Sequence, residues 1–198
     1  PVDRGAELMR LGLDPGRPTV VVSFGGQGSV LVGQVARSLA AAGLGANAIL
    51  LCGRDEGLRQ SLVALRTPYP KAVLGYQPQS PVHLLRLADP VVGKPGSMTI
   101  AEAVVLGRPL VAVRAGGMRP VQRGNEAWLE ASGVGRIAPT AAEVGPLVSQ
   151  VLADDGCRQS AARAYHRGVF DAAQVVARLL ATGAREPVAA TATSMERA

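Results

Sequence analysis

Three short segments of the sequence contain residue types that together could hold a ligand with phosphate and sugar groups. Residues 25–29 (GGQGS) are rich in glycine, residues 93–103 (GKPGSMTIAEA) combine a lysine with hydroxyl side chains and a glutamate, and residues 122–125 (QRGN) carry two amides. Backbone N–H groups at a helix start attract phosphate, whereas carboxylates and amides hydrogen-bond to hydroxyl groups. These residues therefore favour binding of a phosphorylated molecule that bears hydroxyl groups.

The first segment follows an apolar run and precedes an amphipathic stretch, so it is predicted to join a strand to a helix. Gly25, Gly26 and Gly28, with Gln27 among them, let the backbone approach an anion closely beside the helix N-terminus. A tight turn that holds no ligand would use the same glycines, and the motif alone leaves this alternative open.

The second segment is more informative, because it predicts another helix that begins at an anion site. Gly96 allows an unusual turn, after which Ser97, Met98 and Thr99 present their N–H groups at the helix start. Lys94 precedes this turn and could offset the charge of a diphosphate. The alternative for Lys94 is a solvated lysine at the surface.

Glu102 is expected in the first turn of the same helix, on the face that also carries Thr99. Its carboxylate could accept two hydrogen bonds from a ribose diol, as acidic residues do in other nucleotide-binding folds. In the alternative interpretation the carboxylate interacts only with the helix dipole.

Gln122 and Asn125 form the third segment, close to the start of another predicted helix. An amide offers both a donor and an acceptor, so a pair at this spacing could bind the hydroxyl groups of a sugar. A helix cap and a surface glutamine would account for the same residues.

Alternating strands and helices are predicted to position these segments. We expect an α/β, Rossmann-like fold with a parallel sheet of about six strands and helices on both faces. The predicted strands are 18–24, 46–52, 72–74, 89–92, 109–113 and 136–137, and the predicted helices are 29–42, 56–65, 81–87, 99–106, 122–131, 141–152 and 154–181. Four loops, 25–29, 75–77, 93–99 and 115–125, then follow strands and meet at one sheet edge, where ligands of such folds bind.

Residues 1–183 are expected to form one domain, followed by a disordered tail at 184–198.

Composition narrows the classes of partner. The net charge of +6 comes almost wholly from scattered arginines, and aromatic residues make up only 3% of the chain, so we expect no nucleic-acid partner. Cys52 and Cys157 lack the spacing of a metal site, and Cys52 is expected in the core. No apolar stretch reaches the ~18 residues of a membrane-spanning helix.

The order strand, GGQGS, helix, strand, GKPGSMTIAEA, helix, strand, loop, QRGN, helix resembles the C-terminal donor domain of the GT-B glycosyltransferases. It is most similar to family 28, which includes the lipid II-forming N-acetylglucosaminyltransferase and the monogalactosyldiacylglycerol synthases. The resemblance covers about residues 11–181 and is most specific in GSMTIAEAVVLGRPLV.

The resemblance implies a donor site for a nucleoside diphosphate sugar, with UDP as the expected nucleotide and no cofactor or metal. It assigns the glycine loop and the helix start to the diphosphate, and Lys94 stands where a relative has arginine. It also implies that the backbone at Tyr76 contacts the uracil, that Glu102 binds the ribose and that Gln122 and Asn125 hold the sugar. The implied donor-binding residues are Gly25, Gly26, Gln27, Gly28, Tyr76, Lys94, Gly96, Ser97, Met98, Thr99, Glu102, Gln122 and Asn125.

The implied reaction is an inverting transfer of the sugar to a lipid or another hydroxyl acceptor. The family's general base lies in an N-terminal acceptor domain, so we expect no catalytic residue in this chain, which by itself would be inactive. His83 and His166 are expected to be structural or surface residues. The loop 115–120 departs from the family's pattern, and Val121 stands where a second amide often occurs. The resemblance further implies a cytoplasmic enzyme with a peripheral membrane contact.

Three alternatives remain open at this point. The chain could be a stand-alone donor subunit that pairs with a separate acceptor subunit, or part of a UDP-sugar 2-epimerase, which shares the architecture. It could also bind a nicotinamide dinucleotide, with Asp55 beyond the second strand as the ribose ligand, although the second glycine segment would then have no explanation.

Overall fold

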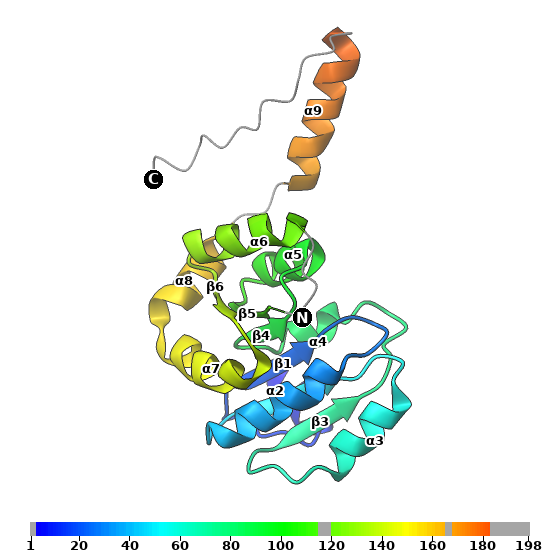
Figure 1. Ribbon diagram of the computed structural model, residues 1–198, viewed down its shortest axis with the longest axis vertical. Coiled ribbons are helices and arrows are strands. Elements are labelled where there is room, and N and C mark those ends of the chain that lie inside the picture. The colour runs from blue at the N-terminus through cyan, green and yellow to red at the C-terminus, as the bar shows by residue number, and fades with distance from the viewer. Residues whose placement is uncertain (1–2, 115–119, 165–167, 183–198) are drawn as a thin grey trace. The chain divides into compact units, whose positions relative to one another are not determined.

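The computed structural model describes residues 3–114, 120–164 and 168–182 (Figure 1). The chain divides into two compact units, one ending at Tyr165 and the other beginning at His166. The described part of the second unit is a single helix, α9 (Gly168–Thr182). All six strands belong to the first unit, which therefore contains the predicted loops.

A parallel sheet of six strands forms the centre of the first unit and confirms the predicted fold class. Its order is β3-β2-β1-β4-β5-β6, and every neighbouring pair is parallel. The strands are β1 (Thr19–Ser23), β2 (Asn47–Leu51), β3 (Lys71–Leu74), β4 (Val91–Gly93), β5 (Leu110–Val113) and β6 (Gly135–Ala138). From β1 the chain adds β2 and β3 on one side of the sheet, and then β4, β5 and β6 on the other side of β1. The switch point of the sheet therefore lies between β1 and β4.

Helices cover both faces of this sheet. They are α1 (Arg4–Arg10), α2 (Val30–Ala41), α3 (Glu56–Ala64), α4 (Val82–Leu85), α5 (Ser97–Val105), α6 (Pro120–Ala131), α7 (Val144–Ala153) and α8 (Asp155–Arg163), with a 3-10 turn at Ala141–Glu143. Buried side chains form two clusters, and β1 contributes alternately to them: Val20 and Val22 to one, Val21 to the other. This alternation is what a strand buried on both faces requires.

The first cluster contains the buried face of α2, including Val35 and Leu39, together with Val148 of α7. The second contains Leu8 of α1 and Ile100 of α5, together with buried residues of α4, α6 and α8. Cys52 is fully buried in the first cluster, as its apolar context indicated. Each face of the sheet therefore has its own apolar core, which fixes the loops at the strand ends.

Three details differ from the sequence-based expectations. Helix α1 was not anticipated, because Leu8 is its only buried residue and its periodicity is weak. The predicted helix 154–181 is not continuous: α8 ends at Arg163, and Ala164 adopts an extended conformation (φ −62°, ψ 129°). Helix α5 begins at Ser97, two residues earlier than predicted, so Glu102 lies in its second turn. None of the described helices is long and apolar enough to cross a membrane.

Candidate functional site

The glycine loop after β1 is held against the loop after β2 by direct backbone contact. Gly25 and Gly28 have φ angles of 104° and 93°, which favour glycine. A Cβ atom at Gly28 would lie 2.6 Å from the carbonyl oxygen of Cys52, and one at Gly53 would lie 2.5 Å from the Gly28 nitrogen. The amide of Arg54 donates to the carbonyl of Gly26 at 3.0 Å. The conformation of this loop therefore depends on close packing that side chains would prevent.

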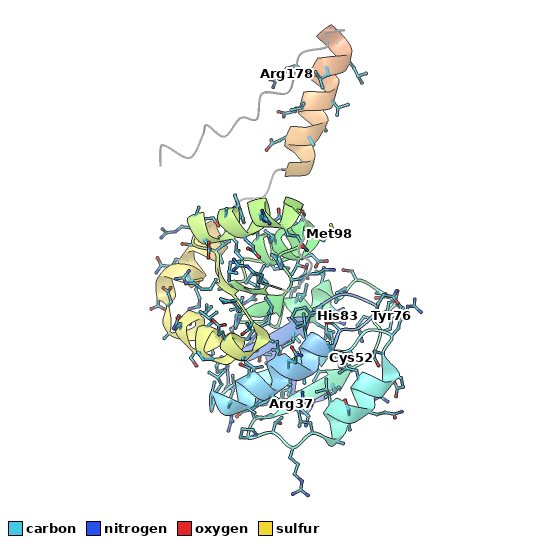
Figure 2. The ribbon with its side chains drawn as sticks, in the orientation of Figure 1. Arg37, Cys52, Tyr76, His83, Met98 and Arg178 are labelled. Atoms are coloured by element: carbon cyan, nitrogen blue, oxygen red, sulfur yellow. The ribbon has the colours of Figure 1, made fainter. Side chains whose placement is uncertain are left out.

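An aromatic ring and a guanidinium group stack beside this loop. The ring of Tyr76, which follows β3 and is 43% exposed, lies 3.3 Å from the position that a Cβ atom of Gly26 would occupy (Figure 2). The guanidinium carbon of Arg54 lies 3.9 Å from the centre of the Tyr76 ring, a cation–π contact. Sequence reasoning missed Arg54, although its place after β2 puts it at the same sheet edge as the predicted loops.

A cleft of about 260 Å³ opens at the carboxyl ends of β1, β2 and β3. It is lined by glycines of three loops and by the segment that begins at Tyr76, including Gly25, Gly26, Gly53, Gly75, Tyr76 and Gln77. Its walls combine backbone polar groups with one aromatic ring, a lining that suits a small ligand with a planar apolar part.

Lys94 connects the glycine loop to the second predicted segment. Its Nζ atom lies 3.9 Å from the position of a Cβ atom on Gly25, although 69 residues separate them in sequence. The side chain is exposed, and no residue in the described part of the chain accepts a hydrogen bond from it. The ammonium group is thus positioned between two loops and remains able to bind an anion.

The start of α5 presents the backbone donors that the sequence predicted. Gly96 is the N-cap residue and provides no side-chain cap, so the N–H groups of Ser97, Met98 and Thr99 begin the helix without an acceptor within it. Ser97 and Met98 are exposed, and Met98 is labelled in Figure 2, whereas Thr99 is half-buried beside Gly93 at the end of β4. The prediction of an unusual turn at Gly96 is wrong, because its φ of −86° is a backbone angle that residues other than glycine also adopt.

Glu102 lies one turn into α5 and is half-buried. Burial raises the pKa of its carboxyl group above the ordinary value. No hydrogen-bond donor to this carboxylate is found among residues 3–114, 120–164 and 168–182. Its position beyond the first turn weakens the interpretation that it serves the helix dipole, because that interaction fades within one turn.

The amides of the third segment both have partners. Asn125 lies within α6, so it is not the helix cap that the alternative interpretation assumed. Its Nδ2 atom donates to the carbonyl of Pro95 at 3.0 Å and to Oγ of Ser97 at 3.2 Å. Gln122 is half-buried and also makes an interaction. Asn125 therefore links α6 to the loop before α5 and to the first residue of α5.

An ion pair between a half-exposed arginine and a buried glutamate joins the middle of α6 to the end of β5. Glu126 is 5% exposed, and its carboxylate accepts from Nε of Arg114 at 3.2 Å and from Nη2 at 2.9 Å. Arg114 directly follows β5, and the hydrogen bonds to Glu126 raise its pKa. The pair positions α6 relative to the strand end, a role that the sequence analysis did not predict.

Two residues of the alternative interpretations have local partners. Asp55 caps α3, since its Oδ1 accepts from the amide of Leu58 at 2.8 Å, which weakens its assignment as a ribose ligand. His83 is exposed on α4 with Nδ1 3.2 Å from the carbonyl of Ser80, in agreement with a surface role. Residues 115–119, His166, the side chain of Val121 and the tail 184–198 lie outside the described residues.

Curated relatives of the chain are lipid glycosyltransferases. It is 29% identical to monogalactosyldiacylglycerol synthase 1 of Arabidopsis thaliana over 75% of its own length and 29% of the relative's. It is 28% identical to the processive diacylglycerol beta-glucosyltransferase of Staphylococcus saprophyticus over 70% of its length and 35% of the relative's. The chain thus spans about a third of these relatives. No protein-family profile matches it.

Solved structures with the same arrangement are GT-B glycosyltransferases. MurG of Acinetobacter baumannii superposes with a TM-score of 0.67 and 16% identity, over 90% of this chain and 54% of that one. HepE of Anabaena, crystallised with UDP-glucose, gives a TM-score of 0.68 and 21% identity, over 92% and 53%. The chain therefore has the fold of one half of a GT-B enzyme, and its sequence is similar to family 28, as its motifs indicated.

Proposed function

We propose that this chain is the donor-binding half of an inverting glycosyltransferase that moves a sugar from a nucleoside diphosphate, with UDP as the expected nucleotide, to a lipid or another hydroxyl acceptor. The observation that carries the proposal is the approach of Lys94 to Gly25, which joins two loops that are far apart in sequence. Lys94 also lies beside Gly96, the residue that precedes helix α5, so its side chain adjoins both the glycine loop and the start of this helix. This combination suits a diphosphate.

The names of similar proteins support the same class of donor. HepE was crystallised with UDP-glucose, and the spinosyn rhamnosyltransferase SpnG, with a TM-score of 0.55, was crystallised with thymidine diphosphate. The curated relatives are named for transfer of a sugar to diacylglycerol. A lipid acceptor and a peripheral membrane contact are the corresponding expectations for this chain.

In the proposed reaction, the N–H groups of residues 97–99 and the ammonium of Lys94 stabilise the negative charge that develops on the departing diphosphate. The half-buried carboxylate of Glu102 accepts hydrogen bonds from the ribose hydroxyl groups, which compensates the cost of its burial. Neither role requires a metal ion. The base that deprotonates the acceptor belongs to an acceptor domain or subunit, as the length of the relatives suggests.

Calorimetry with UDP and with NAD, each titrated separately into the chain, tests the donor assignment. We expect saturable binding of UDP, no comparable binding of NAD, and weaker binding of uridine, because uridine lacks the diphosphate. Tight binding of NAD without binding of UDP would refute the proposal and restore the nicotinamide alternative.

Two assays on the complete enzyme separate the remaining alternatives. Incubation with UDP-sugar alone, followed by analysis of the sugar, would reveal the epimerised product of a 2-epimerase. Copurification of the chain with a second protein that restores transfer would identify a two-subunit enzyme. For the proposed reaction we expect transfer to an added acceptor with inversion at the anomeric carbon, which NMR of the product measures directly.

A further inference from the structure

A second groove lies at the sheet edge opposite the candidate donor site. It has a volume of about 380 Å³ and is lined by residues that precede strands, such as Pro18 before β1 and Asp89 before β4, and by side chains of α1, α7 and α8. In a parallel sheet the amino ends of all strands share one edge. The groove is therefore separate from the loops that follow the strands, and the proposed donor chemistry does not use it.

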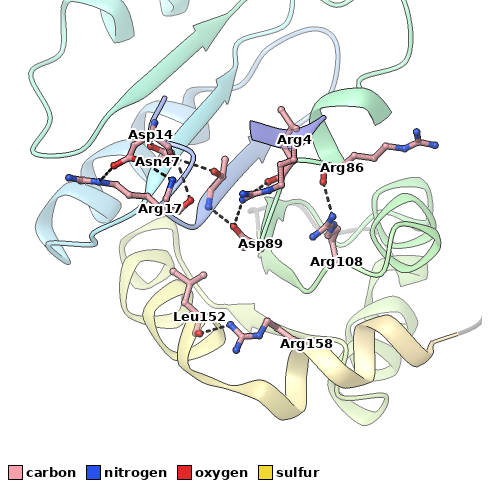
Figure 3. Close-up of polar contacts among 12 residues, drawn as sticks. Arg4, Asp14, Arg17, Asn47, Arg86, Asp89, Arg108, Leu152 and Arg158 are labelled. Atoms are coloured by element: carbon pink, nitrogen blue, oxygen red, sulfur yellow. Dashed lines mark hydrogen bonds and ion pairs between the residues drawn. The ribbon is translucent and has the colours of Figure 1, made fainter. Parts of the chain in front are cut away.

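Three of the eight lining residues are arginines that come from three different segments: Arg4 on α1, Arg17 in the loop before β1, and Arg158 on α8 (Figure 3). The only acidic lining residue is Asp89. Its Oδ2 atom is already occupied by Nη2 of Arg4 and by the amide of Thr19, both at 2.7 Å. The single negative charge of the groove is thus satisfied by the protein itself.

The hydrogen bonds of the three lining arginines use only some of their N–H groups. Arg17 uses only Nε, toward Asp14 at 3.0 Å, and Arg4 uses only Nη2, toward Asp89 and the carbonyl of Leu87. Arg158 uses Nη1 toward the carbonyl of Leu152 and Nη2 toward Asp155. Each guanidinium group has five N–H donors in a fixed fork. Several therefore remain without an acceptor among the described residues.

A fourth arginine adds positive charge that no carboxylate pairs. Nη2 of Arg108 donates to the carbonyl of Arg86 at 2.8 Å, while its Nε is buried without an acceptor in the described part of the chain. Burial lowers the pKa of Arg108; the negative charge of Asp89 opposes this shift, and the positive charge of Arg4 adds to it. Arg108 does not line the groove itself, but it adds a positive charge that interacts with Asp89 and Arg4, two residues that do.

The partners that these arginines already have are weak competitors. The Arg17–Asp14 and Arg158–Asp155 pairs are both formed between residues three apart, with side chains 43% to 74% exposed. Exposed pairs of this kind contribute little to stability, so a stronger anion can replace or extend them. One guanidinium group can donate two parallel hydrogen bonds to two oxygens of the same phosphate. A phosphoryl group is therefore the anion that this arrangement of arginines suits best.

We infer that the groove formed by Arg4, Arg17, Asp89 and Arg158 is a second binding site of this protein, and that its ligand is a phosphate group. A free phosphate ester and the headgroup of an anionic lipid offer the same chemistry. The inference does not depend on the proposed donor site, since no residue is shared between the two.

Titration of the full ¹⁵N-labelled chain with inorganic phosphate, at constant ionic strength, tests the inference residue by residue. We expect saturable shifts of the amide signals of Gly16, Arg17, Thr19 and Asp89, distinct from any shifts at residues 97–99. The variant Arg17→Gln/Arg158→Gln should bind phosphate in the groove about tenfold more weakly. Its matched control is Arg10→Gln/Arg59→Gln, which removes two arginines from equivalent pairs outside the groove.

Sedimentation with vesicles distinguishes the two sources of phosphate. Binding to vesicles that contain phosphatidylglycerol, but not to phosphatidylcholine vesicles, and its loss in the Arg17→Gln/Arg158→Gln variant would identify a lipid headgroup. Phosphate binding without vesicle binding would identify a soluble phosphate ester. Absence of saturable shifts in the groove, or equal phosphate affinity in the variant and its control, would overturn the inference, irrespective of the result of vesicle sedimentation.

Discussion

At the scale of single residues, Glu102 has the most direct connection to the proposed ligand. Because its carboxylate is half-buried and lacks a partner among the described residues, a ribose diol would satisfy it. We expect Glu102→Ala to weaken UDP binding by ~1–3 kcal/mol in calorimetry, the cost of leaving a polar partner unpaired. Glu130→Ala, at an exposed position, is the control. Equal affinity of both variants would remove Glu102 from the site.

The same carboxylate predicts a dependence of stability on pH. Burial raises the pKa of Glu102 in the folded protein above its ordinary value of 4.5, so the folded state favours the neutral acid. Above the folded pKa the charged carboxylate therefore costs stability, and this cost disappears as the pH falls below 4.5. We expect Glu102→Gln to have a higher melting temperature than the parent at pH 7, with the difference shrinking in acid. A variant that is less stable at pH 7 would contradict this.

Gly28 tests whether close backbone packing shapes the glycine loop. Alanine there would meet the carbonyl of Cys52 at 2.6 Å in addition to an unfavourable φ of 93°. Gly43 also has a positive φ, of 62°, but has open space around it. We expect Gly43→Ala to cost about 1 kcal/mol and Gly28→Ala about 2–4 kcal/mol in urea unfolding. Equal costs would show that contact with the loop after β2 contributes nothing.

At the scale of elements, the Arg114–Glu126 pair should determine how α6 is attached to the sheet. Glu126→Ala leaves a half-exposed guanidinium unpaired and a cavity in a buried position. We expect a loss of about 1–2 kcal/mol in unfolding free energy, together with weaker UDP binding, because Asn125 on the same helix holds the loop before α5. Glu130→Ala, which removes only a weaker attraction to Arg114, should have a much smaller effect on both quantities. Lost stability with unchanged UDP affinity would separate α6 from the donor site.

The elements themselves could be predicted well where burial determines the pattern. Strands β1, β2 and β5 are short, mostly apolar runs, and Ser29 and Gly43 mark the ends of α2 as capping preferences suggest. Helix α1 was missed because only Leu8 is buried, and the start of α5 was misplaced because Gly96 provides no side-chain cap. The pattern of apolar residues thus predicts strands and helices that bury a whole face. It does not define a helix with one buried residue, or a helix end that has no side-chain cap.

Contacts between distant loops could not be predicted in the same way. The stack of Arg54 on Tyr76, and the bonds from Asn125 to Pro95 and Ser97, join segments whose separation depends on the order of the strands. The sequence indicated which loops meet at one edge, because parallel strands end together. It did not indicate which side chains touch once the loops are there.

At the scale of the whole molecule, the positive charge of the chain is distributed over both edges of the sheet. The net charge is +6, with Lys94 and the start of α5 at one edge and the arginine groove at the other. Two anion sites of this kind predict a measurable response to salt, because counterions screen an exposed ammonium and a helix terminus more effectively than they weaken apolar contacts.

We therefore expect the affinity for UDP to fall about three- to tenfold between 0.05 and 0.5 M sodium chloride, a range over which the screening length drops from about 14 to 4 Å. Uridine binding, which lacks the phosphate contacts, should change little over the same range. Repeating the titration with Arg17→Gln/Arg158→Gln removes the contribution of the distal groove. If UDP binds at the carboxyl edge, this variant keeps the parent's affinity and slope; a flattened slope would mean that the groove, and not the glycine loop, is where the diphosphate binds.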